Sequence, residues 1–74
     1  MNKIRREKLK TIAVKLKDIN SELSKILDEE NYCFDNMPEN LQNSFRGNNS
    51  EDAIEIMEES IEKIKEIIDE LITI

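Results

Sequence analysis

Two segments of the chain carry apolar residues at alternating steps of three and four. The first is Leu9, Ile12, Leu16, Ile19, Leu23 and Ile26. The second is Ile54, Met57, Ile61, Ile64, Ile68 and Leu71. This spacing places each set along one face of an α-helix, so it predicts two amphipathic helices with heptad seams.

Both seams are wider than the two positions per heptad of a simple coiled coil. Ala13 and Leu27 widen the first seam, and Ala53, Ile67 and Ile74 widen the second. A stripe of this width needs more than one neighbouring helix. In parallel coiled coils, Leu at every a position with Ile at every d position also favours more than two strands. We therefore predict that the twelve seam residues pack against one another and also form a self-association core.

The segment between the seams sets the expected boundaries. Pro38 disfavours helical geometry at Met37, so the first helix is expected over about 2–35. The linker is expected over about 36–49, with a short helical turn in PENLQ and a flexible connection at Gly47. Asn49 or Ser50 is the expected N-cap of a second helix over about 50–73.

These elements predict an all-α fold, a two-helix antiparallel hairpin that is a single domain over 1–74. At about 1.5 Å per residue, the first helix is roughly 50 Å long and the second roughly 37 Å. The basic first turns of the chain should therefore project beyond the end of the second helix. A chain of 74 residues buries only a small core, and such a core gives marginal stability by itself. We therefore expect the hairpin to assemble into a dimeric or tetrameric bundle.

The composition argues against catalysis. The chain has no histidine and one cysteine, Cys33, which excludes an internal disulfide and disfavours a zinc site. We predict no catalytic residue, no metal and no cofactor. Cys33 continues the Ile row of the first helix and is expected to be a small buried hydrophobe. No apolar run is long enough for a membrane span or a signal peptide, which predicts a cytoplasmic protein.

Charge is distributed unevenly along the chain. Residues 1–17 carry seven basic side chains and one acidic, whereas the remainder carries a net charge of −12. The acidic remainder argues against direct nucleic-acid binding, and pairing of the basic start with Glu66, Asp69 and Glu70 is the preferred interpretation. The second helix also presents an acidic face that is a candidate mimic of DNA phosphates. Its residues are Glu55, Glu58, Glu59, Glu62 and Glu66.

Several side chains are candidates for contact with a partner or ligand. They are Tyr32, Phe34, Phe45, Arg46, Arg5 and Arg6. Aromatic and arginine side chains are enriched at binding hot spots. The alternative is that the aromatics fill the end of the bundle. Arg46 and the N-terminal arginines are also candidates for holding a small anionic nucleotide between subunits.

The linker contains the residues Asp35, Asn36, Met37, Pro38, Glu39, Leu41 and Gln42. With these residues it resembles the central segment D-N-M/L-P-E-x-L-Q of a group of small phage and prophage proteins of Gram-positive bacteria. The resemblance implies a helical hairpin with a basic start and an acidic second helix, and an origin in a mobile element. The group has no settled activity.

Our leading functional hypothesis is a non-enzymatic interaction module that binds itself. Two alternatives stay open. One is an accessory inhibitor that binds a host defence or nucleic-acid-handling protein through the acidic surface. The other is a sponge for a small anionic nucleotide.

Overall fold

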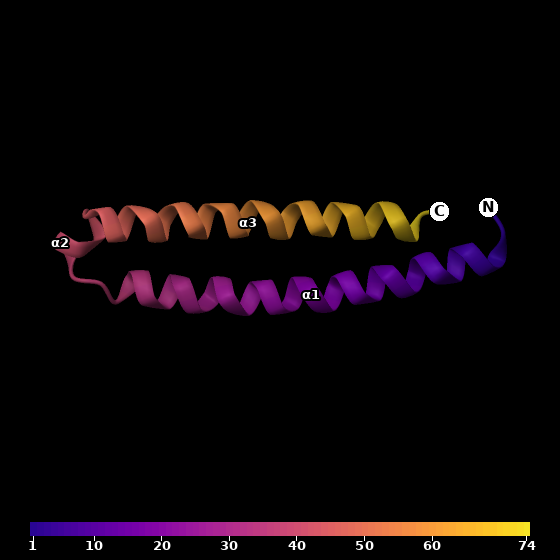
Figure 1. Cartoon of the computed structure of the whole chain (residues 1–74), viewed down its shortest axis with the longest axis horizontal. Coiled ribbons are helices and arrows are strands. Elements are labelled where there is room, and N and C mark those ends of the chain that lie inside the picture. The colour runs from indigo at the N-terminus through magenta and orange to yellow at the C-terminus, as the bar shows by residue number, and fades with distance from the viewer.

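The computed structural model describes all residues, 1–74, and consists of helices joined by tight turns (Figure 1). Helix α1 spans Lys3–Asp35, α2 spans Glu39–Gln42 and α3 spans Phe45–Ile72. The long helices α1 and α3 lie side by side and run in opposite directions, and the molecule measures 58 × 14 × 12 Å. The prediction of an all-α antiparallel hairpin is confirmed.

The ends of α1 follow from local chemistry. The side chain of Asn2 accepts a hydrogen bond from the backbone N–H of Arg5 at 2.9 Å, which satisfies one free donor of the first turn. The helix ends at Asp35 with Asn36 as its C-cap, two residues before Pro38. The predicted end of the first helix is confirmed. Short helix α2 forms within PENLQ as predicted, although Pro38 is its N-cap and not its first helical residue.

The predicted start of the second helix is wrong. Helix α3 begins at Phe45, and Ser44, not Asn49 or Ser50, is its N-cap, with its hydroxyl accepting from the N–H of Gly47 at 3.4 Å. Gly47 is helical and buried, and it does not have a positive φ. A Cβ at this position would collide with the backbone carbonyls of Leu41 and Gln42. Glycine is therefore needed for the close approach of α3 to α2, not for flexibility.

The seam predicted for α3 does face α1. Ile61 and Ile68 are buried, and the other four residues of that seam are partly buried. The seam predicted for α1 is only half right. Its leucines at 9, 16 and 23 face α3, but its isoleucines do not contribute to this interface. Ile12, Ile19 and Ile26 remain 46%, 52% and 53% exposed. The interface instead uses the row of Ala13, Asn20 and Leu27.

Two hydrogen bonds between the long helices fix their register. The Nδ2 of Asn20 donates to the carbonyl oxygen of Ile61 at 3.2 Å, and the Ser50 hydroxyl donates to Oε1 of Glu30 at 2.5 Å. This register places Ala13 at the level of Ile68, and Phe34 at the level of Gly47. Small residues of one helix thus oppose large residues of the other, which lets the two backbones approach. That complementarity explains why α1 turns its Ala13 row, and not its isoleucines, toward α3.

The register leaves the first turns of α1 without a neighbour. Figure 1 shows the N-terminal end of α1 extending past the C-terminal end of α3, as the difference in helix length predicted. None of the helices is both long enough and apolar enough to cross a membrane.

Candidate functional site

One side of the hairpin carries apolar side chains that the contact between α1 and α3 leaves exposed. On α1 these are isoleucines spaced seven residues apart. The equivalent row of α3 has the same spacing, but its members Ala53 and Ser60 are partly buried and Ser60 is polar. We call this surface the isoleucine flank; it consists of Ile12, Ile19, Ile26, Ala53, Ser60 and Ile67, with Ile74 just beyond the end of α3. Ile56, which is 63% exposed, borders it on α3.

The two rows lie on the same side of the hairpin. Each row directly precedes an inward-facing row: Ile12 precedes Ala13 on α1, and Ile67 precedes Ile68 on α3. Two antiparallel helices can be exchanged by a half-turn about an axis perpendicular to the plane that contains them. This half-turn does not exchange the two sides of the plane, so rows in equivalent positions on the two helices lie on the same side of the hairpin. With the observed register, Ile12 lies near the level of Ile67, and Ile19 near the level of Ser60. The isoleucine flank is therefore continuous across both helices.

The opposite side of the hairpin is polar. It carries the one pocket of the molecule, an open groove of about 300 Å³. Six of its seven lining residues are polar or charged. They are Lys17, Asn20, Ser21, Ser24, Lys65 and Asp69, with Ile68 as the apolar member. The hairpin thus has one apolar and one polar side.

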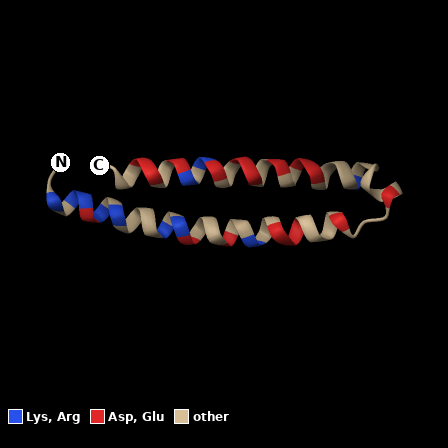
Figure 2. Cartoon of the chain, turned by 180° about the vertical axis from the view of Figure 1, so that it is seen from behind, with Lys and Arg blue, Asp and Glu red and all other residues tan.

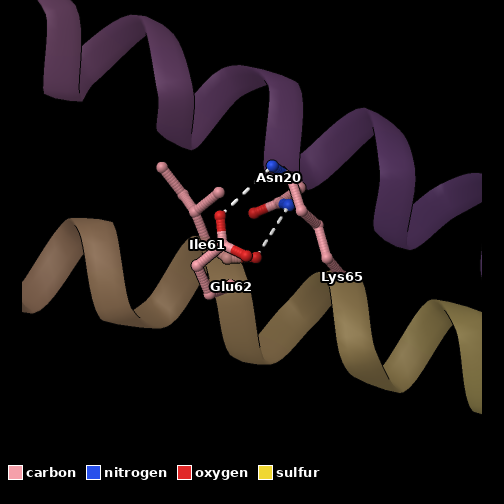
Figure 3. Close-up of polar contacts among 4 residues, drawn as sticks. All are labelled: Asn20, Ile61, Glu62 and Lys65. Carbon is pink, nitrogen blue, oxygen red and sulfur yellow. Dashed lines mark hydrogen bonds and ion pairs between the residues drawn. The ribbon is translucent and has the colours of Figure 1, made fainter.

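Asn20 lies between these two sides, in the core. It is 6% exposed, and its Nδ2 points to the Ile61 carbonyl across the interface (Figure 3). Its Oδ1 is buried without a hydrogen-bond partner. Nearby on α3, Lys65 pairs with Glu62 at 3.3 Å. An unpartnered buried amide oxygen costs free energy, so Asn20 reduces stability while fixing which residues face each other.

The charges form two regions along the long axis (Figure 2). Residues 20–60, at the end that holds α2, carry eleven acidic and two basic side chains, a net charge of −9. The remaining residues, at the end that holds both termini, carry nine basic and six acidic side chains, a net charge of +3. The hairpin therefore has an acidic end and a basic end.

These charges are almost all unpaired within the chain. The one ion pair joins Lys65 and Glu62, both on α3. The predicted pairing of the basic start with Glu66, Asp69 and Glu70 does not occur inside the hairpin, where no ion pair joins α1 to α3. The predicted acidic face is present on α3, and all five of its glutamates are exposed.

The candidate contact residues divide between the two ends of the molecule. Tyr32 and Phe45, near the α2 turn, are 72% and 82% exposed, so they do not fill the end of the hairpin. Phe34 is partly buried, and its carbonyl accepts from Nε2 of Gln42 at 3.0 Å. Arg46 lies at this acidic end, whereas Arg5 and Arg6 lie at the opposite end. A single chain therefore does not bring these arginines together around one anion.

The prediction that Cys33 is buried is wrong for the single chain. The thiol is exposed, because Cys33 continues the row of Ile12, Ile19 and Ile26, which faces away from α3. No group of three or more His, Cys, Asp or Glu side chains is arranged to hold a metal ion.

Sequence reasoning missed the polar residues of the helix interface. Asn20, Glu30 and Ser50 all lie on inward-facing rows. The available signal was that Asn20 falls seven residues after Ala13 and seven before Leu27, so it interrupts an otherwise apolar row.

The chain was compared with family models, with curated proteins and with solved structures, and none of them matches it.

Proposed function

We propose that the chain is a non-enzymatic interaction module that binds a second copy of itself through the isoleucine flank. The observation that carries the proposal is the row of Ile12, Ile19 and Ile26, which is roughly half exposed although the hairpin is fully formed. Aligned isoleucines with a fixed spacing are typical of a helix that packs against another helix. The resemblance of the linker supports an origin in a phage or prophage.

The exposed surface is of the size that such an interface needs. The chain exposes 5860 Å², whereas a compact monomer of 8.7 kDa exposes about 4,700 Å². The excess, roughly 1,100 Å², reflects the elongated shape, and it leaves room for the roughly 800 Å² that one partner contributes to a standard interface. Only 6 of 74 residues are buried in the single chain, so covering the isoleucine flank would enlarge a small core.

The test is a pair of matched substitutions measured by sedimentation equilibrium. Ile19→Asp places an unpaired charge at the centre of the isoleucine flank and is expected to raise the dissociation constant by about a hundredfold or more. Val14→Asp is the control. Val14 is similarly exposed, at 58%, but it lies outside the isoleucine flank, on the surface of α1 that points away from α3 and borders the polar side.

Circular dichroism is expected to show that both variants stay helical, since neither side chain belongs to the hairpin interface. Equal association of Ile19→Asp and the unsubstituted chain would exclude the isoleucine flank as the binding surface.

A second candidate function is that of an accessory inhibitor that binds a basic host protein. The exposed, unpaired acidic residues of the α2 end support it. Replacing Glu55, Glu58 and Glu59 with glutamine should then abolish competition with DNA for a DNA-binding host protein, while Ile19→Asp should retain it. Competition that survives the glutamine substitutions would reject this function.

A further inference from the structure

We propose that the second copy runs antiparallel to the first, with a twofold axis at the level of Ile19 and Ser60. The inference rests on the proposed function, since it names the orientation of the partner on the isoleucine flank. It follows from a row of charges beside the isoleucines.

Two flat faces of this kind can be stacked symmetrically in two ways. If the twofold axis runs along the hairpin, α1 lies over the partner's α3 and the two α2 turns lie at the same end. If the axis runs across the hairpin, α1 lies over the partner's α1 and the α2 turns lie at opposite ends. In the second arrangement Ile19 meets the partner's Ile19, and Ile12 meets the partner's Ile26.

A charged row borders the isoleucines of α1 on the side away from α3. It contains Lys8, Lys15, Glu22 and Glu29, each three or four residues from an isoleucine of the flank and therefore its neighbour on the helix surface. All four side chains are exposed, and none takes part in the ion pair of the chain. The row is positive in its first half and negative in its second.

This row complements itself only when two copies run in opposite directions. With the axis at Ile19, Lys15 lies opposite the partner's Glu22, and Lys8 lies opposite the partner's Glu29. With the axis along the hairpin, the row instead faces the partner's α3, where the observed register places Lys15 near the partner's Lys63 but Lys8 near the partner's Glu70. That arrangement has one like-charge contact, whereas both contacts of the antiparallel one join opposite charges.

The charge of the whole molecule favours the same orientation. Antiparallel stacking puts the basic end of each chain over the acidic end of the other. Stacking with both α2 turns together would instead bring two regions of net charge −9 side by side.

The test reverses the charged row in two complementary full-length variants. In the acidic variant, Lys8→Glu and Lys15→Glu make the row entirely negative; in the basic variant, Glu22→Lys and Glu29→Lys make it entirely positive. At low salt each variant alone is expected to associate about tenfold or more weakly than the unsubstituted chain. Mixing the two, with an affinity tag on one, is expected to restore a heterodimer.

The control is Lys10→Glu with Lys17→Glu, which changes the net charge as much as the acidic variant does but on the side of the polar groove. It is expected to keep most of the affinity of the unsubstituted chain. Unchanged dimers of both row variants, or a mixture that does not form heterodimers, would overturn the antiparallel orientation while leaving self-association intact. A monomeric unsubstituted chain would instead overturn the proposed function itself.

A second measurement does not depend on charge. A chain with Cys33→Ser and Ile19→Cys has one thiol, which lies on the proposed twofold axis. Oxidation is expected to link two such chains through position 19. With the axis along the hairpin, position 19 faces the partner's Ser60 and no link forms, so its absence in a dimer would contradict the proposal.

Discussion

Asn20 shows how one polar side chain limits stability in the hairpin core. Its Nδ2 reaches the Ile61 carbonyl, but its Oδ1 remains buried without a partner. Buried polar residues at coiled-coil core positions are known to specify register at a cost in stability. Asn20 fits this role, because its hydrogen bond sets the level at which α1 and α3 meet.

Replacing Asn20 with leucine should therefore stabilise the chain. The substitution removes the unsatisfied oxygen and adds apolar surface, and it is expected to raise the free energy of unfolding by about 1–2 kcal/mol. For a chain of this size that corresponds to a rise in Tm of roughly 4–8 °C per kcal/mol. Asn20→Asp should lower the Tm, because it buries a charge without a partner. A lower Tm for Asn20→Leu would show that the amide is better satisfied than the geometry indicates.

Gly47, at the start of α3, stabilises the hairpin, whereas Asn20 destabilises it. An exposed glycine in a helix costs up to about 1 kcal/mol relative to alanine, so its replacement normally stabilises. Here a Cβ would meet the carbonyls of Leu41 and Gln42, and backbone groups cannot move aside as a flexible side chain does.

Gly47→Ala is accordingly expected to lower the free energy of unfolding by about 1–3 kcal/mol. Asn48→Ala, at an exposed position in the same turn, is the matched control and should be neutral or slightly stabilising. Thermal melts of both variants would check this. If Gly47→Ala were as stable as the control, the close approach of α2 to α3 would have to be wrong.

At the scale of the elements, periodicity predicted the helices well and their facing sides less well. The seam of α3 and the end of α1 at Asp35 followed directly from apolar spacing and from Pro38. The stripe of α1 was three positions wide, and such a stripe does not indicate which two positions face the partner helix. Pairing of Ala13 and Asn20 with large isoleucines decided that choice, and it depends on both helices together.

The start of α3 was missed for a related reason. The apolar seam begins at Ile54, and the run of Gly47, Asn48 and Asn49 is typical of a turn. The helix nevertheless starts at Phe45, because Ser44 supplies the cap and α2 packs against the first turn. Local propensity was overridden by a contact that no sequence pattern of this length reveals.

At the scale of the whole molecule, the hairpin has an apolar interior, an apolar side and a polar side, which the apolar spacing of the sequence did not distinguish. Its interior holds the leucines of α1 and the seam of α3, one side carries the isoleucine flank, and the other side carries the polar groove. Charge is separated along the length as well, with an acidic end at the α2 turn (Figure 2).

The mass of the unsubstituted chain in solution tests the central claim most directly. Light scattering coupled to size exclusion, over a range of concentrations and at low and high salt, should give about twice the chain mass of 8.7 kDa, or a higher multiple if dimers stack further. The apolar contact should keep the assembly together in high salt, with some weakening from screening of the charged row. A mass of 8.7 kDa at every concentration and salt would contradict self-association and leave the isoleucine flank without a second copy to cover it.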